Sequence, residues 1–164
     1  MARRPLTGVL LVGGASARFG SSKELAEYDG ETLRARAWRL LGDACEERIA
    51  VGRDGLDDPG TGPVAAIAVG LRAASHELAI VIPVDMPLLT AAALHALADA
   101  CRDAAVAQGG PLPCAVARSA LPAFDTGERR LRAVLAGLDT ATIELDERVL
   151  VNVNTPAELD TLAP

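Results

Sequence analysis

A glycine-rich segment with two cationic side chains is the first candidate functional site in this sequence. It reads LLVGGASARFGSSK, from Leu10 to Lys23, and its Gly13-Gly14 pair follows a short apolar run. Glycines free the backbone to present N–H groups, and Arg18 and Lys23 add positive charge, a combination that suits phosphate groups. A plain connection between a strand and a helix is the alternative. The segment is neither a Walker A loop nor a dinucleotide-binding fingerprint, because the glycine spacings of those motifs are absent.

The lysine of this segment stands out from the rest of the composition. Lys23 is the only lysine among the 16 basic residues, all the others being arginine. This usage indicates a position that needs a compact ammonium group rather than a planar guanidinium. A chance exposed lysine is the alternative.

A second candidate group is the carboxylate of the segment VDMPLL, from Val84 to Leu89. Asp85 directly follows a long apolar, β-branched run, and the nearby proline restricts the turn. A hard oxygen ligand at such a position suits Mg²⁺, so Asp85 is the candidate metal ligand. A cap at the start of the following helix is the alternative role for this carboxylate.

The segment NVNTPAEL, from Asn152 to Leu159, carries two amide side chains. Asn152 and Asn154 point the same way if the segment is extended, and two amides on one side can hold a polar ligand. Turn and capping roles are the alternative. The two histidines, His76 and His95, lie on or beside predicted helices without partners at ligand spacing, and we interpret both as structural.

Strands and helices are predicted to alternate along the chain. The predicted strands are Leu6–Val12, Arg48–Val51, Leu78–Val84, two short runs around Val106 and Val116, Thr140–Leu145 and Val149–Val151. The predicted helices are Glu31–Asp43, Val64–Ala74, Thr90–Ala104, Asp125–Gly137 and Thr155–Leu162, and Thr90 and Thr155 are predicted to cap theirs. This order predicts an α/β fold of three layers around a doubly wound, mostly parallel, Rossmann-like sheet. Ligands of such folds bind beyond the carboxyl ends of the strands, where Gly13 and Asp85 are expected.

Composition limits the classes of partner. With 164 residues, half of them hydrophobic, the chain is expected to form one domain over residues 1–164. The formal net charge of −6 argues against nucleic-acid binding, and no segment reaches the ~20 apolar residues that span a bilayer. The three cysteines are odd in number and widely spaced, so we expect free thiols in a reducing, cytoplasmic environment.

Taken together, these segments resemble the molybdenum cofactor guanylyltransferase (MobA-like) branch of the nucleotidyltransferase superfamily. The motifs that carry the resemblance are LVGGASARFGSSK, the turn GPVAAI from Gly62 to Ile67, VDMP, NVNTPAEL, and the late helix GERRLRAVL. Phe19, Ser22, Val84 and Ala66 depart from the usual family residues. An added Cβ at Ala66 narrows a turn that approaches the nucleotide.

The resemblance implies a nucleotidyltransferase fold and a reaction. GTP and molybdopterin-bound molybdenum would give the guanine dinucleotide cofactor and pyrophosphate, with Mg²⁺ held by Asp85. Lys23 and Arg18 would stabilise the departing pyrophosphate, and Asn152 and Asn154 would hold the pterin acceptor. The residues expected to bind the nucleotide are Leu11, Gly13, Gly14, Lys23, Asp57 or Asp58, Gly62 and Pro63.

Two other functions fit the same motifs. One is a related nucleotidyltransferase that uses CTP, or another phosphorylated acceptor such as a sugar phosphate. The other is a catalytically silent nucleotide-binding protein that passes the cofactor to a partner enzyme. The sequence sets neither the oligomeric state nor the identity of an enzyme that receives the product.

Overall fold

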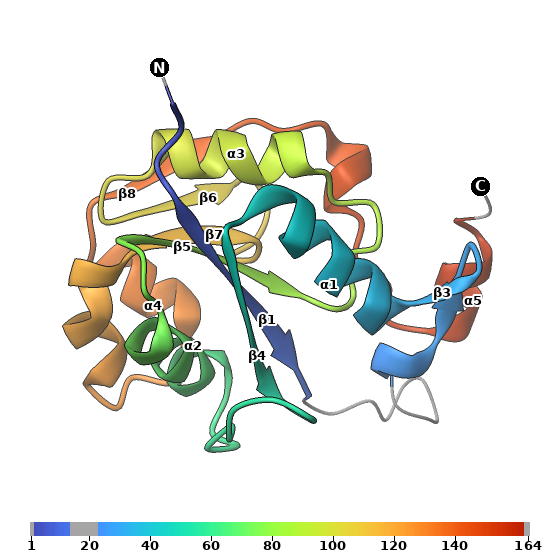
Figure 1. Ribbon diagram of the computed structural model, residues 1–164, viewed down its shortest axis with the longest axis horizontal. Coiled ribbons are helices and arrows are strands. Elements are labelled where there is room, and N and C mark those ends of the chain that lie inside the picture. The colour runs from blue at the N-terminus through green and yellow to red at the C-terminus, as the bar shows by residue number, and fades with distance from the viewer. Residues whose placement is uncertain (1, 14–22, 163–164) are drawn as a thin grey trace.

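A six-stranded sheet forms the middle of the molecule in the computed structural model, which describes residues 2–13 and 23–162 (Figure 1). The strand order is β4-β1-β5-β7-β6-β8. All pairings are parallel except those of β7, which runs against both of its neighbours. The sheet strands are β1 (Leu6–Val12), β4 (Glu47–Gly52), β5 (Leu78–Pro83), β6 (Ala104–Ala107), β7 (Cys114–Ala117) and β8 (Thr140–Ile143).

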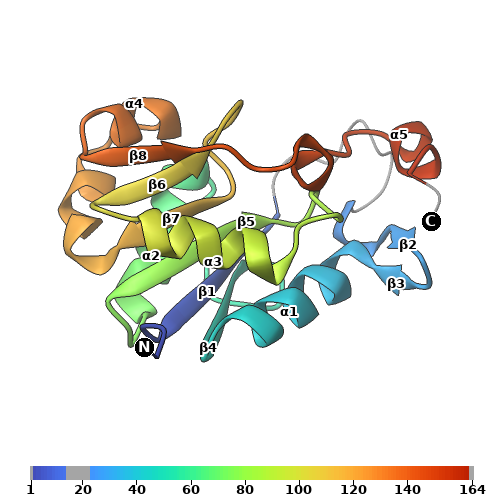
Figure 2. The same cartoon turned by 90° about the horizontal axis from the view of Figure 1, so that it is seen from above.

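Helices cover both faces of this sheet, as the predicted doubly wound fold requires (Figures 1 and 2). Helices α1 and α3 pack on one face, and α2 and α4 pack on the other with a 3-10 segment. Strand β1 is buried on both faces and contributes to both apolar cores, which is why its sequence is continuously apolar. The bounds are α1 Leu33–Ala44, α2 Pro63–Ala73, α3 Ala91–Ala100, α4 Leu131–Ala136 and the 3-10 segment Arg118–Asp125.

The crossovers place a ligand crevice at β1. From β1 the chain passes through α1 to β4 on one side, and from β4 it passes through α2, on the opposite face, to β5 on the other side. The strand order therefore reverses between β1 and β5, and their carboxyl ends meet at a topological switch point. Val12 and Pro83 end these two strands.

A small substructure beside this edge was not predicted. Strands β2 (Glu27–Tyr28) and β3 (Glu31–Thr32) form a hairpin that packs against α5 (Pro156–Asp160) (Figures 1 and 2). Asp29 and Gly30 both have positive φ, as a type I′ hairpin turn requires. Tyr28 joins the two parts, because its hydroxyl donates to the carbonyl of Leu162 at 2.7 Å.

Three predicted elements are wrong in extent or type. The helix from Thr90 ends at Ala100, because the alanine-rich residues that follow pair as β6 between β7 and β8. Thr90 itself caps the helix as predicted. The predicted helix Asp125–Gly137 is helical only over α4, and the predicted strand Val149–Val151 overlaps a 3-10 turn, Glu147–Leu150.

Local hydrogen bonds explain the last two errors. Glu128 accepts from the backbone N–H of Arg130 at 2.9 Å, which offers the chain an alternative to an earlier helix start. Asp146 accepts from the backbone N–H of Arg148 at 3.0 Å and so caps the 3-10 turn where a strand was expected. None of the helices within the described ranges is long and apolar enough to cross a membrane.

Candidate active site

A pocket of about 290 Å³ opens at the carboxyl ends of β1 and β5, the predicted location. The end of β1, the end of β5 and the first turn of α2 form its walls. Seven residues expected to bind nucleotide or metal line it together: Leu11, Gly13, Lys23, Asp58, Gly62, Pro63 and Asp85. The other lining residues are Val12, Glu24, Gly60, Ala66, Pro83, Val84 and Leu112.

Lys23 and Asp85 form an ion pair in this pocket. The Lys23 Nζ atom lies 3.5 Å from Oδ2 of Asp85, and their side chains are only 17% and 21% exposed. Burial raises the pKa of the Asp85 carboxyl above its ordinary value, while the nearby ammonium of Lys23 acts in the opposite direction. The second oxygen, Oδ1, is buried and has no hydrogen-bond partner among the described residues.

The buried oxygen of Asp85 suits a hard metal ion. A buried carboxylate oxygen without a partner is costly, and a cation would satisfy it. Within residues 2–13 and 23–162, no three His, Cys, Asp or Glu side chains gather as a metal-binding cluster. A single carboxylate fits Mg²⁺, which keeps several water ligands and binds through one or two carboxylates and substrate phosphates.

The start of α2 adds a positive partial charge to the pocket. Gly62 is the N-cap of the helix and Pro63 is its first residue. Proline is common at this position because a backbone N–H there would have no partner within the helix. The eleven-residue helix directs its N-terminal dipole end toward the pocket, which favours an anion there. Ala66 lies in the first turn and is 3% exposed, so its methyl group forms part of the wall.

Glu24 is a pocket residue that sequence reasoning missed. Its side chain is 4% exposed, and its Oε1 atom lies 3.0 Å from Nε of Arg53. Arg53 follows β4, and its backbone N–H donates to the carbonyl of Val12 at 3.1 Å. The sequence offered one signal, a second charged residue directly after Lys23. The burial of Glu24, however, depends on Arg53, which is distant in sequence.

Of the two aspartates expected in the loop between β4 and α2, only one lines the pocket. Asp58, rather than Asp57, lines the pocket. Oδ1 of Asp58 accepts from the backbone N–H of Gly60 at 2.8 Å, which fixes a turn and leaves the carboxylate at the pocket wall. The two aspartates are adjacent, so sequence alone offered no basis for choosing between them.

The asparagine segment lies directly beside the Asp85 loop, residues 84–89, although neither amide lines the pocket. Val153 is fully buried, and its backbone N–H donates to the carbonyl of Asp85 at 2.8 Å. Asn152 is exposed, and Asn154 is half-buried, with its N–H donating to Glu158 at 2.7 Å. The contact brings residues 152–154 next to the candidate metal ligand.

Two predicted site residues, Gly14 and Arg18, lie outside the described residues. The histidines are away from the pocket wall. His95 has its Nε2 atom 2.9 Å from the carbonyl of Ala44, which agrees with a structural role. The pocket therefore combines a lysine, a partly desolvated carboxylate and a helix N-terminus at the switch point of an open α/β sheet, the arrangement of a protein that binds a phosphorylated ligand.

Comparison with known proteins narrows this class. The family model of the MobA-like NTP transferase domain matches residues 8–149. The chain belongs to the MobA-like NTP transferase family, a family of nucleotidyltransferases.

Similar proteins match over almost their full length. The chain is 35% identical to molybdenum cofactor guanylyltransferase of Xanthomonas euvesicatoria pv. vesicatoria, over 98% of this chain and 95% of that protein. It is 34% identical to the probable molybdenum cofactor guanylyltransferase of Deinococcus radiodurans, over 97% and 94%. The crystal structure of molybdopterin-guanine dinucleotide biosynthesis protein A from Archaeoglobus fulgidus has the same fold, with a TM-score of 0.79, 22% identity, and coverage of 94% and 95%.

Proposed function

We propose that this protein transfers GMP from GTP to molybdopterin-bound molybdenum, giving the guanine dinucleotide cofactor and pyrophosphate. The observation that carries the proposal is the meeting of Lys23, Asp85 and the N-terminus of α2 in one pocket. The choice of GTP and of the pterin acceptor is supported by the names of the similar full-length proteins.

The proposed reaction is a substitution at phosphorus. A terminal phosphate oxygen of the acceptor attacks the α-phosphorus of GTP, and the bond from that phosphorus to the oxygen bridging to the β-phosphorus breaks. The electron pair leaves with pyrophosphate. Because the attacking phosphate is already ionised at neutral pH, no strong general base is needed, and alignment and charge stabilisation carry the catalysis.

Asp85 would hold Mg²⁺ through its carboxylate, of which Oδ1 is buried and without a described partner. When bound, the metal neutralises charge on phosphate oxygens and polarises the reacting phosphorus. Lys23, held beside Asp85, places an ammonium where the phosphates would lie, and Arg18 of the glycine-rich segment would share the charge of the departing pyrophosphate.

The remaining pocket residues would hold the nucleotide. The backbone at Gly13, and the glycine Gly14 that follows, would bind phosphate oxygens through N–H groups, with Leu11, Gly62 and Pro63 as walls. The aspartate contact is proposed for Asp58, which lines the pocket where Asp57 does not.

On the acceptor side, we propose that Asn152 and Asn154 bind the pterin. The hydrogen bond from Val153 to Asp85 supports this role, since it brings the chain that carries both asparagines beside the candidate metal ligand. The unpaired cysteines fit a reducing compartment, and a cytoplasmic location is part of the proposal.

The direct test measures pyrophosphate release from GTP, CTP, ATP and UTP with Mg²⁺, with and without a molybdopterin-type acceptor. The expected result is release from GTP only when the acceptor is present, and its loss in Lys23→Ala. Release from CTP instead would assign a different nucleotide. Nucleotide binding without release under every condition would overturn the enzymatic function in favour of a carrier.

A further inference from the structure

The Asp85 loop is held from two sides through its backbone. On one side, the N–H of Val153 donates to the carbonyl of Asp85 at 2.8 Å. On the other, Nε of Arg36, from α1, donates to the carbonyl of Pro87 at 2.6 Å. A hydrogen bond from a charged donor is stronger than a neutral one, so Arg36 is the stronger of these two anchors.

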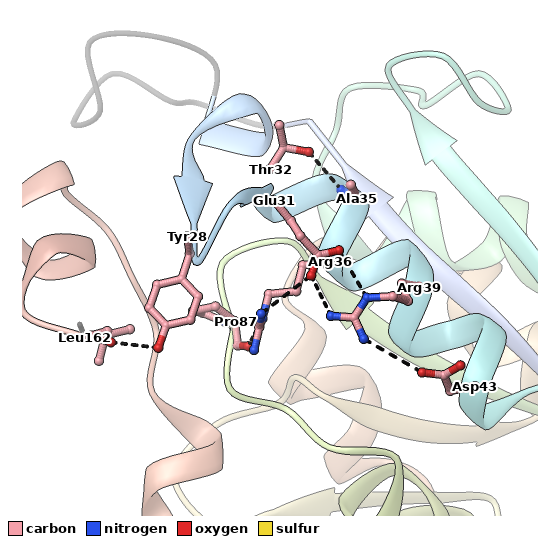
Figure 3. A network of polar contacts seen from close by, with 9 residues as sticks. All are labelled: Tyr28, Glu31, Thr32, Ala35, Arg36, Arg39, Asp43, Pro87 and Leu162. Carbon is pink, nitrogen blue, oxygen red and sulfur yellow. Dashed lines mark hydrogen bonds and ion pairs between the residues drawn. The ribbon is translucent and has the colours of Figure 1, made fainter. Parts of the chain in front are cut away.

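Arg36 is itself held in place before it reaches the loop (Figure 3). Its guanidinium carbon lies 5.0 Å from the centroid of the Tyr28 ring, and its NH1 atom lies 3.6 Å from Oε1 of Glu31. Tyr28 in turn donates to the carbonyl of Leu162. The guanidinium is thus fixed by a ring face and a carboxylate, at 25% exposure, with Nε aimed at Pro87.

Arg36 does not reach the pocket itself, since it is not among the described residues that line it. Its influence must pass through Met86, the one residue between its anchor at Pro87 and Asp85. Misplacing a reacting or metal-binding group by about 1 Å costs about 10²-fold in rate. The other restraints on the loop are of a different kind: the side chains of Val84, Met86 and Leu89 are buried in the core, and Lys23 pairs with the Asp85 carboxylate. Within the loop, the N–H of Leu89 donates a long bond of 3.4 Å to the carbonyl of Met86.

We infer that Arg36 is a positioning residue for Asp85: by fixing the carbonyl of Pro87, it sets the place of the carboxylate that would hold the metal. The expected effect of Arg36 on kcat rests on the proposed function. The expected effect on metal binding does not.

The test compares Arg36→Ala and Arg36→Lys with a control on the same helix, Arg39→Ala. Arg39 pairs with the same Glu31, at 2.5 Å from NH2 to Oε1, and with Asp43, and none of its described hydrogen bonds or ion pairs reaches the Asp85 loop. The three variants therefore separate the anchor on Pro87 from the ion pair with Glu31. The measurements are kcat, KM for GTP, Mn²⁺ affinity by electron paramagnetic resonance, and thermal unfolding.

Arg36→Ala is expected to lower kcat by about 10- to 100-fold and to weaken Mn²⁺ binding by about 10-fold, with KM for GTP unchanged, since loss of an outer support of a metal ligand costs 10- to 100-fold. Arg36→Lys keeps a charged donor and should recover most of both losses. It also provides the test if Arg36→Ala does not fold. Arg39→Ala should match the wild type in kcat and Mn²⁺ affinity. Equal losses in Arg39→Ala, or a change in KM alone, would overturn the inference.

A double variant isolates the path through Asp85. In the Asp85→Asn background, Arg36→Ala should weaken Mn²⁺ binding no further, because both changes act on one ligand. An additive loss would show that Arg36 acts elsewhere. If the wild type releases no pyrophosphate from GTP but Arg36→Ala still weakens Mn²⁺ binding, the proposed function fails and the inference stands. Mn²⁺ binding that is indifferent to Asp85→Asn would sink the inference itself.

Discussion

The ammonium nitrogen of Lys23 lies 3.5 Å from Oδ2 of Asp85, and both side chains are largely removed from solvent. The pair joins the 3-10 turn Lys23–Leu25 to the end of β5, two segments about 60 residues apart in sequence. One member is suited to phosphate charge and the other to a metal ion. Their contact holds both groups in one pocket before a substrate arrives.

Replacing Lys23 should affect catalysis more than nucleotide binding. Lys23→Met keeps the apolar stem but removes the ammonium, and we expect kcat for pyrophosphate release to fall by about 10²- to 10³-fold, as for loss of a charge-stabilising donor. Lys23→Arg keeps the charge and should retain part of the activity, but not all, because the planar group is larger. Steady-state kinetics with GTP check this. An active Lys23→Met variant would remove Lys23 from the mechanism.

Metal affinity should fall on mild acidification. Burial raises the pKa of Asp85, so its carboxylate is protonated at a higher pH than an exposed aspartate, and a protonated carboxyl binds Mg²⁺ poorly. As the pH is lowered, Mn²⁺ titrations should show that affinity begins to fall at a pH above the ordinary titration range of an aspartate. In Asp85→Asn this dependence should vanish. A pH profile unchanged by the substitution would assign the titration to another group.

The same shift has a consequence for stability with the opposite sign. Because the folded protein binds the Asp85 proton more tightly than the unfolded chain does, stability falls as pH rises from the ordinary value of 3.8 through the raised pKa. Asp85→Asn should therefore raise Tm at neutral pH, and the difference should shrink in acid. A rise of about 2–4 °C would correspond to about 1 kcal/mol in a domain of this size. A lower Tm at neutral pH would contradict the direction.

The Glu24–Arg53 pair should show an asymmetry between its partners. Arg53→Ala leaves the carboxylate of Glu24 buried without its cation, and we expect a cost of about 1–3 kcal/mol in the free energy of unfolding. Glu24→Gln leaves an arginine that is already 58% exposed, so it should cost less. The double variant should be more stable than Arg53→Ala. Urea unfolding measures all three, and a larger loss in Glu24→Gln would reverse the argument.

Gly52 should tolerate no side chain. It has φ of +116°, and an added Cβ would lie 1.5 Å from the carbonyl oxygen of Val12, at the end of β1. Gly52→Ala should destabilise the protein by about 3 kcal/mol or more and disturb the pocket. Gly30→Ala is the control, because Gly30 also has positive φ, +81°, but no atom within 4 Å of the added Cβ. It should cost only about 1–2 kcal/mol. Equal losses of stability in the two variants would show that the close approach of Gly52 to Val12 adds nothing to the cost of positive φ.

The cysteine thiols should resist alkylation in the folded protein. Burial raises the pKa of Cys45 and Cys114 to about 12 and that of Cys101 to about 11, so little thiolate exists at neutral pH. Iodoacetamide should leave all three unmodified in buffer and modify all three in urea, as mass spectrometry would show. Rapid modification of the folded protein would mean that local opening exposes a thiol.

The sequence predicted the strands that carry the site because these signals are local. Buried strands of a parallel sheet read as continuous apolar runs, which made β1 and β5 clear. Gly13 follows β1 directly, and Asp85 comes two residues after the end of β5. Thr90 and Thr155 were correctly predicted as helix caps for the same reason. These features need no knowledge of tertiary contacts.

Errors occurred where tertiary contacts or competing local bonds decide the outcome. Alanine favours a helix and is depleted in strands, so the alanines of β6 extended the helical pattern, and only pairing with the neighbouring strands β7 and β8 selects the strand. The hairpin at Asp29-Gly30 carried a recognisable turn signal that was missed, since its strands are only two residues long. The burial of Glu24 and the anchoring of the Asp85 loop by Arg36 depend on partners far along the chain, which no local pattern reveals.

The hydrogen bond from Val153 to Asp85 also bears on the order of events during synthesis. Strand β5 and helix α1 can leave the ribosome and begin to pack while residue 153 is still to be made. During that interval Pro87 can already meet Arg36, but the carbonyl of Asp85 lacks its second anchor. The 68-residue separation between Asp85 and Val153 cannot close until residue 153 has been made, so this contact follows the one at Pro87. A nascent chain would therefore contain the pocket walls before the Asp85 carboxylate is fixed from both sides, which would delay catalytic competence until folding is nearly complete.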